Sequence, residues 1–304
     1  MQSFWNELVK NKYLYLLTLP ALLYFIVFSY LPMFGIVIAF QDFSPIKGIA
    51  GSEFVGWRNF DFFFTSSDWL TVTFNTIYLN ALFIVLGLIA QIAFAVMISE
   101  MFNKTFKKAI QSLTLLPYFI SWPVVSMFSI AFFSTDEGLI NYVLKSFGAE
   151  AINFYQDPSV WPALLVMLKI WKGTGYGIVI YLATIASIDQ EIYESARMDG
   201  ANRYQAIRHI TLPMLTNTTI LLFILAVGRI FFGDFGMIYA LIGDNTLLYP
   251  TTDVIDTYVY RALRSYGDMS MSSAIGLYQS VVGFILVVIT NGLVRKWNKD
   301  ASLF

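Results

Sequence analysis

The sequence predicts an all-α, polytopic membrane protein with about six transmembrane helices and cytoplasmic N- and C-termini. The first observation is composition: of 304 residues, 57% are hydrophobic and 13% are charged, whereas soluble domains carry about a quarter charged residues. The second is a set of apolar runs long enough to cross a bilayer, which takes about 20 residues in a helix. The third is an uneven distribution of lysine and arginine between the connecting segments, which sets the orientation.

Long apolar segments define the spans in chain order. The first follows Lys10 and Lys12, is longer than a signal-peptide core and is followed by no small-residue cleavage site, so we expect a span rather than a cleaved signal. Continuous runs exclude a transmembrane barrel, whose strands alternate apolar and polar residues over about ten positions. The six predicted spans are 13–40, 69–99, 109–135, 160–188, 214–240 and 270–294.

The basic residues of the connecting segments gather on one side. The first set comprises Lys10, Lys12, Lys104, Lys107, Lys108, Arg197, Arg203, Arg208, Arg295, Lys296 and Lys299. The opposite set comprises Lys47, Arg58, Lys145, Arg261 and Arg264. Because cytoplasmic loops are enriched in Lys and Arg, the first set is predicted to be cytoplasmic. We expect residues 1–304 to form one multi-pass domain in the cell membrane.

Several kinds of site are excluded by residue content. The chain has no cysteine and one histidine, His209, so it cannot form a disulfide, a thiolate metal site or a multi-histidine metal site. A net charge of -1 gives no basic field for nucleic acid. The glycines at 173–177 are not followed by the Lys-Ser/Thr of a phosphate-binding loop. We therefore expect no metal, no cofactor and no ATPase site in this chain.

The cytoplasmic segment 189–213 is predicted to be a small helix–turn–helix. Asp189 can cap a helix that extends to Met198, and Gly200 can provide the left-handed residue that ends it. Asn202 with Gln205 three residues later resembles a capping box for a second helix. An apolar stripe on that helix can pack on the chain's own spans or face a partner, and the pattern leaves both alternatives open.

This segment resembles the EAA motif of type I ABC importer permeases. Glu194-Ser195-Ala196 is followed by Asp199-Gly200, and then, after residues 201–209, by Ile210-Thr211-Leu212-Pro213. A serine stands where the family has its first alanine, a change between small residues. Further stretches resemble the carbohydrate branch of the family, in particular its polysaccharide and complex-oligosaccharide permeases. They are FVGWRNF at 54–60, NT at 75–76, IDTYVYR at 255–261 and AIGLYQSVVG at 274–283.

The resemblance implies a function in carbohydrate import. In such a system the EAA loop is the coupling helix that docks on a separate ABC ATPase dimer, which binds ATP and Mg. Glu194 would contact basic groups of the ATPase, and Gly200 would make the sharp turn. The resemblance also implies a second homologous permease subunit, with a heterodimer favoured, and an extracellular solute-binding protein that delivers the sugar.

Two lysines occupy the fourth predicted span. Lys169 and Lys172 are three residues apart and share a helical face, and a charge at the centre of a span costs at least about 2.5–3.5 kcal/mol. Either they line a water-filled cavity and contact substrate, or they snorkel or pair with a carboxylate on a neighbouring span. Both alternatives are open from the sequence.

Arg229 and Asp234 lie in a glycine-rich part of the fifth predicted span, residues 228–236. Broken helices near the bilayer midplane often form transporter sites. The alternative is a structural Arg–Asp pair that stabilises the bundle.

Aromatic residues complete the predicted pathway. Trp122, Trp171 and Tyr176 could stack on the C–H faces of sugar rings, or could face lipid and pack between helices. Pro117 and Pro123 should kink the third span, because proline lacks the N–H of the helix ladder.

Two other functions compete with the importer. An ion-coupled secondary transporter would need carboxylates within its spans, of which Asp234 is the one candidate. An intramembrane enzyme would need paired acids or a His–Asp set, and the spans contain neither.

Overall fold

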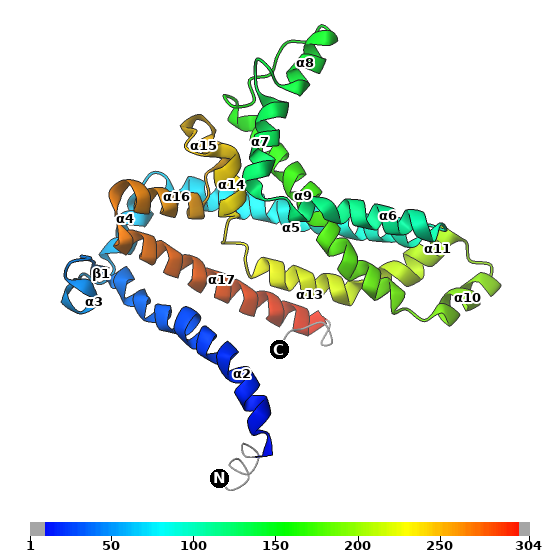
Figure 1. Cartoon of the computed structure of the whole chain (residues 1–304), viewed down its shortest axis with the longest axis horizontal. Helices are drawn as coiled ribbons and strands as arrows, with labels where there is room; N and C mark the ends of the chain where they lie inside the picture. Colours follow the sequence, from blue (N-terminus) through cyan, green and yellow to red (C-terminus); the bar gives the residue numbers. More distant parts are fainter. Residues whose placement is uncertain (1–9, 298–304) are drawn as a thin grey trace. The chain divides into compact units, whose positions relative to one another are not determined.

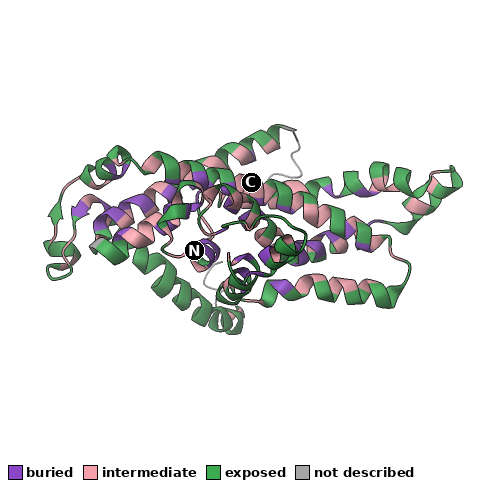
Figure 2. Cartoon of the chain, turned by 90° about the horizontal axis from the view of Figure 1, so that it is seen from above, coloured by how far each residue is buried: buried purple, intermediate pink, exposed green. Residues whose placement is uncertain are grey.

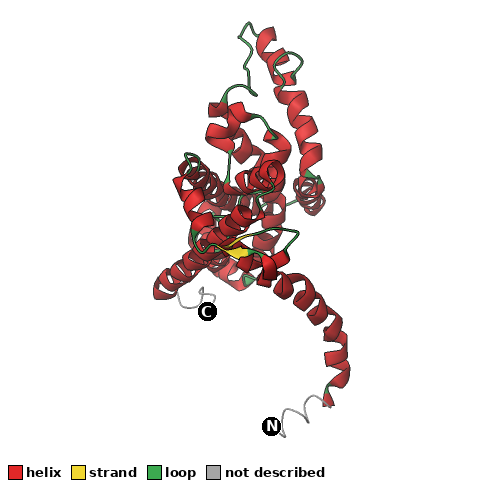
Figure 3. Ribbon diagram, turned by 90° about the vertical axis from the view of Figure 1, so that its left-hand side faces the viewer, coloured by secondary structure: helices red, strands yellow, loops and turns green. Residues whose placement is uncertain are grey.

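The computed structural model describes residues 10–297, apart from the side chains of residues 266 and 297. In that part of the chain helices dominate, and two short strands form the one sheet (Figure 3). The chain forms two compact units: Met1–Ser66 with Val259–Tyr278, and Ser67–Tyr258 with Gln279–Phe304. The predicted cytoplasmic location of both chain ends concerns residues 1–9 and 298–304, which lie outside the described residues.

The first unit begins with a long apolar helix. α2 (Lys12–Phe25) continues as a π-helical turn, η1 (Ile26–Tyr30), and a 3-10 segment, η2 (Leu31–Phe40). Together they form a candidate span over Lys12–Phe40, which confirms the first predicted span. α2 contains no buried residue, and exposed residues cover much of the helix surface elsewhere as well (Figure 2). Such apolar exposure suits helices that face lipid or another subunit.

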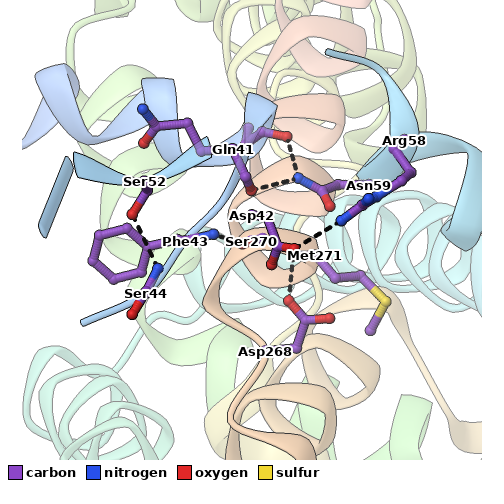
Figure 4. Close-up of polar contacts among 11 residues, drawn as sticks. Gln41, Asp42, Phe43, Ser44, Ser52, Arg58, Asn59, Asp268, Ser270 and Met271 are labelled. Atoms are coloured by element: carbon purple, nitrogen blue, oxygen red, sulfur yellow. Dashed lines mark hydrogen bonds and ion pairs between the residues drawn. The ribbon is translucent and has the colours of Figure 1, made fainter. Parts of the chain in front are cut away.

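A small polar cluster follows in the same unit (Figure 4). β1 (Gln41–Asp42) pairs antiparallel with β2 (Glu53–Phe54), and α3 (Gly48–Gly51) lies between them in the chain. In α4 (Arg58–Thr65), Asn59 donates hydrogen bonds to the carbonyls of Ala39 and Gln41, at 2.9 and 3.0 Å. Arg58 pairs with Asp42 at 2.9 Å. The strands were not predicted, because two-residue strands have no readable periodicity.

The second unit is built on two long helices that pack along each other, α5 (Trp69–Ser99) and α9 (Trp161–Ala186) (Figure 1). Both confirm predicted spans. One buried cluster includes Leu79, Trp161 and Met237, and a second includes Ile178 and Tyr181. These two clusters form the buried interior of the unit.

The third predicted span is sharply bent. α6 (Lys104–Leu115) with η3 (Leu116–Phe119) meets α7 (Trp122–Phe133) at 98°. Pro117 lies in η3 and Pro123 in the first turn of α7, so the proline-induced kink predicted from the sequence is confirmed. The two halves together count as one bent candidate span.

The fifth predicted span, 214–240, is wrong as a continuous helix. α13 (Thr216–Val227) ends before Gly228, and a separate helix, α14 (Phe235–Ile242), begins after Asp234. Residues 228–234 between them, called the break from here on, are not helical. Asp234 caps α14 by accepting a hydrogen bond from the Met237 N–H at 3.1 Å. α13 with the helical segment Arg203–Met214 forms a second bent candidate span, at 49°.

The sixth predicted span is confirmed by α17 (Met269–Trp297). By length and composition, the described residues thus contain four candidate spans, or six if each bent pair counts as one. The remaining elements are α8 (Leu139–Ser146), η4 (Pro158–Val160), α10 (Gln190–Met198), α11 (Arg203–Ala206), η5 (Ile207–Thr211), α12 (Leu212–Met214), η6 (Thr246–Leu248), α15 (Tyr249–Thr252), α16 (Ile255–Arg261) and η7 (Ala262–Tyr266).

Candidate functional site

The loop 189–213 has the local structure that its sequence predicts. The Asp189 side chain accepts a hydrogen bond from the Glu191 N–H at 3.0 Å and caps α10. Gly200 has a φ of +82°, the left-handed conformation that ends many helices. Asn202 and Gln205 exchange hydrogen bonds of 2.8 and 2.9 Å as a capping box at the start of α11. Two helices therefore meet at a fixed turn.

The EAA-like residues of this loop fall into two groups. A hollow of about 340 Å³ is lined by Ala196, Asp199, Gly200, Ala201, Gln205, Ala206, His209 and Ile210. Glu194 and Ser195 are exposed on α10, and Leu212 and Pro213 belong to α12, outside the hollow. The loop thus presents a concave surface with exposed acidic groups, Glu194 and Asp199, that a partner with basic side chains could contact.

The same loop is also held against its own chain. The Tyr193 hydroxyl and the buried Thr211 hydroxyl are 2.9 Å apart. The Arg203 guanidinium lies 4.0 Å from the ring centroid of Phe102, in the turn after α5. The loop therefore combines the two alternatives that the sequence left open: one side packs on the chain, and the other is exposed.

A cavity of about 560 Å³ lies in the second unit, between α5, α9, α13 and the break. Four of the predicted pathway residues line it, and Trp122, Trp171 and Lys172 do not. The lining residues are Asn80, Phe83, Ile84, Leu88, Gln91, Lys169, Tyr176, Gly177, Ile180, Leu222, Ala226, Arg229, Phe232, Gly233, Asp234 and Phe235.

In the cavity Asp234 pairs with a lysine of another helix and not with the nearby Arg229. Lys169 and Asp234 form an ion pair of 2.6 Å, with side chains 35% and 25% exposed. The alternative of an Arg229–Asp234 pair is therefore wrong. Arg229 is exposed to the cavity and forms no side-chain hydrogen bond or ion pair with any residue from 10 to 297. The cavity lining therefore contains one ion pair, Lys169–Asp234, and the guanidinium of Arg229, which has no ion-pair partner among the described residues.

Lys172 has a different environment from Lys169. Its ammonium donates a 2.7 Å hydrogen bond to the carbonyl of Tyr118, in the kink of the third span. It also lies 5.4 Å from the ring centroid of Trp122. A cation at the end of η3 satisfies a carbonyl that the kink leaves without a helical partner. Lys172 and Trp122 therefore stabilise the bent span.

The other two aromatic candidates, Tyr176 and Trp171, lie in different environments. Tyr176 stacks on Tyr118 with ring centroids 5.0 Å apart, while it lines the cavity. Trp171 is 45% exposed and lines an apolar groove with Phe94 and Met167, which agrees with the lipid-facing alternative.

Sequence reasoning missed the amides of the cavity. Asn80 and Gln91 lie on α5 and line the cavity. A usable signal existed, because a polar amide within an otherwise uncharged span needs a partner or a wet surface. Asn80 precedes Phe83 and Gln91 follows Leu88 on α5, so polar side chains line the cavity at two places that are about three helical turns apart.

Comparison with known proteins agrees with this geometry. Residues 84–299 match the family model described as "Binding-protein-dependent transport system inner membrane component". Protein LplB of Bacillus subtilis is 39% identical over 298 residues, covering 98% of this chain and 93% of that protein. The polygalacturonan/rhamnogalacturonan transport system permease protein YteP of the same organism is 38% identical, covering 97% and 91%.

A solved structure shares the whole architecture. A chain of a bacterial alginate ABC transporter, crystallised in complex with an alginate pentasaccharide-bound periplasmic protein, superimposes with a TM-score of 0.88 at 32% identity, covering 97% of this chain and 98% of that chain. The family model covers more than half of the chain. The chain therefore belongs to the family of inner-membrane components of binding-protein-dependent transport systems.

Proposed function

We propose that this chain, as a single permease domain of residues 1–304, is the transmembrane subunit of an ATP-driven ABC importer. Its cargo is an oligosaccharide or another carbohydrate that an extracellular binding protein delivers. One observation carries the proposal: over 97% of its length the chain matches a chain of a transporter that is described as an alginate ABC transporter in complex with a saccharide-loaded periplasmic protein. YteP, similar over nearly the same length, is named for polygalacturonan and rhamnogalacturonan.

The loop 189–213 is the proposed contact with the subunit that hydrolyses ATP. The concave, partly acidic surface around Gly200 docks on a separate ABC ATPase dimer, which binds ATP and Mg. Glu194 contacts basic groups of that partner. A second, homologous permease subunit completes the pathway, and exposed apolar side chains along α2 are available for lipid or for that subunit.

The cavity is the proposed cargo site. Its rings, Phe83, Phe232 and Phe235, offer faces for the C–H surfaces of sugars, and its amides offer hydrogen bonds for hydroxyls. Arg229 remains free to bind a carboxylate in a bidentate manner, because Lys169 is already paired with Asp234. The open guanidinium favours a saccharide that carries acidic groups.

The test is uptake by the complete complex in liposomes. The permease pair, the ATPase and the binding protein are reconstituted with ATP inside, and uptake of galacturonate oligomers is compared with uptake of their methyl esters. We expect ATP-dependent uptake of the acidic form and a loss of about tenfold in Arg229→Gln, since a charge-assisted hydrogen bond contributes about 1.5–3 kcal/mol. Arg295→Gln, at an exposed position in the last turn of α17, serves as the matched control for loss of an arginine.

The ion-coupled transporter, which the sequence left as the alternative, makes the opposite prediction. Uptake that persists without ATP and stops when an ion gradient is removed would overturn the proposal. No comparison supports that alternative, since the family is defined by its dependence on a binding protein.

A further inference from the structure

The break lies between α13 and α14, within a stretch that the sequence predicts to span the membrane. Residues 228–234 form turns rather than an α-helix, with the N–H groups of Arg229, Ile230 and Phe232 each bonded three residues back. They supply Arg229, Phe232, Gly233 and Asp234 to the cavity. In a bilayer, irregular backbone is tolerated only where protein or a wet cavity satisfies its polar groups. The side chains that do so decide where Arg229 and Asp234 lie.

Three side chains from three other elements bind the break. Asn80 of α5 donates to the carbonyls of Ile230 and Phe232, at 3.1 and 3.3 Å. Gln279 of α17 donates to the carbonyl of Phe231 at 2.8 Å. Asp256 of α16 accepts the Gly233 N–H at 2.5 Å and a second hydrogen bond from Gln279 at 3.2 Å.

Packing fixes the same segment sterically. A Cβ added to Gly233 would lie 2.8 Å from Val254 and 2.9 Å from Asp256, which is closer than real Cβ contacts allow. A Cβ added to Gly228 would lie 2.7 Å from Val287 of α17. The break is therefore fitted to its neighbours at both ends.

The carboxylate that binds the break is itself held from α5. Asn75 donates to the carbonyl of Asp253 at 3.1 Å, and the Thr76 hydroxyl accepts the Ile255 N–H at 2.9 Å. Asp256 follows directly in α16. Three motifs that the sequence shows without a role, NT at 75–76, IDTYVYR at 255–261 and AIGLYQSVVG at 274–283, thus supply Asn75 and Thr76, Asp256, and Gln279 to one polar network.

We propose that Asp256 and Gln279 are positioning residues for the cavity: they hold the break so that Arg229 and Asp234 are presented to the cargo. This inference rests on the proposed function of the cavity. The two residues do not line the cavity and act through the backbone at Phe231 and Gly233. Gln279 joins the two attachment points, since it donates to both the break and Asp256.

Uptake kinetics test the proposal. In Asp256→Ala the acceptor of both hydrogen bonds is removed, because the Gly233 N–H and the Gln279 amide donate to the same carboxylate oxygen. We expect the apparent KM for galacturonate oligomers to rise at least about tenfold, the effect of losing one buried hydrogen bond to a charged group, with a smaller change in maximal rate. Asp256→Asn is the conservative variant: its side-chain oxygen can still accept both hydrogen bonds, and it should keep the KM within about threefold.

A matched control separates positioning from stability. Leu79→Ala creates a cavity in the buried core of α5 without removing a hydrogen bond to the break, and should lower the melting temperature while leaving KM within about twofold. Equal KM values for Asp256→Ala and Leu79→Ala, at equal loss of melting temperature, would overturn the proposal.

A second measurement needs no cargo. The chain has no cysteine, so Ala226→Cys places a single thiol at the cavity wall, one turn before Arg229. A negatively charged thiol reagent should label it at least about fivefold more slowly in the Asp256→Ala background, because the attracting guanidinium has moved. Loss of the Asp256 carboxylate by itself would have the opposite effect and speed the labelling. Unchanged labelling would refute the positioning role, even if wild-type vesicles import no saccharide and the proposed function itself fails.

Discussion

Gly200 offers a test of the coupling loop in which conformation and volume can be separated. Its φ is +82°, and a Cβ added there would meet no atom within 4 Å. Within this chain a side chain therefore fits in space, and the cost of Gly200→Ala to the fold of the loop comes from the backbone conformation. The turn is closed by hydrogen bonds from the Gly200 N–H to Arg197, at 3.0 Å, and from the Ala201 N–H to Ala196, at 2.9 Å.

The magnitude follows from the left-handed conformation. An L-residue with a Cβ pays about 1–2 kcal/mol there, whereas asparagine tolerates this region better than other non-glycine residues. If α10 and α11 must hold their angle to dock, that cost lowers the affinity for the ATPase subunit by about 5- to 30-fold in Gly200→Ala. Gly200→Asn should lose distinctly less.

The assay is titration of the detergent-solubilised permease pair with the ATPase subunit, together with ATP hydrolysis stimulated by the loaded binding protein. Gly173→Ala is the control, because Gly173 lies within α9 and an added Cβ there also meets no atom within 4 Å. We expect that control to behave as wild type. If Gly200→Asn were as damaging as Gly200→Ala, or if Gly200→Ala had no effect, the left-handed turn would not be what coupling requires.

Three further predictions concern the second unit. In Gly175→Ala the new Cβ would lie 2.0 Å from the carbonyl oxygen of Thr114, so α6 and α9 must separate. The free energy of unfolding should fall by about 1–3 kcal/mol. An unchanged melting temperature in detergent would contradict this close approach of the two helices. Lys169→Met and Asp234→Asn should show coupling of about 1 kcal/mol in a double-mutant cycle of stability, and strict additivity would mean that the ion pair contributes nothing. Asp157 caps η4, and hydrogen bonds from Ser159 lower its pKa from the ordinary 3.8. The stabilising contribution of the Asp157 carboxylate is therefore present above pH 3.8 and is lost as the pH falls below that value. Asp157→Asn should remove this acid dependence from the melting curve, and an unaltered curve would show that the Asp157 cap has no role.

The elements that the sequence predicts well are those with local causes. The turn at Gly200 and the cap at Asp189 depend on residues within a few positions of each other, so spacing alone identifies them. The long spans depend on summed hydropathy, which is also local. The kink at Pro117 follows from the missing N–H of proline. The role of the loop in coupling, by contrast, stays a prediction.

Errors arose where the cause is distant in the chain. Arg229, Asp234 and the glycines mark residues 228–234 as a place where a helix can break, but the hydropathy of 214–240 as a whole predicts one span. That α13 ends at Val227 depends on distant partners, because side chains of α5, α16 and α17 bind the backbone of the break. Asp234 was weighed against Arg229, five residues away, but its partner is Lys169, 65 positions away. No sequence spacing encodes such a pair, because tertiary packing of α9 against the break brings the two groups together.

The polar residues of the spans differ in whether their side chains are already engaged in hydrogen bonds or ion pairs within the chain. Lys172 donates to the Tyr118 carbonyl and Lys169 pairs with Asp234, so binding a cargo carboxylate would first require that these interactions be weakened. Asn80 is likewise engaged with the carbonyls of the break. Arg229 has no such partner in the described part of the chain, and replacing it loses no hydrogen bond or ion pair there. This asymmetry makes Arg229, rather than either lysine, the residue whose substitution should change cargo selection without changing stability.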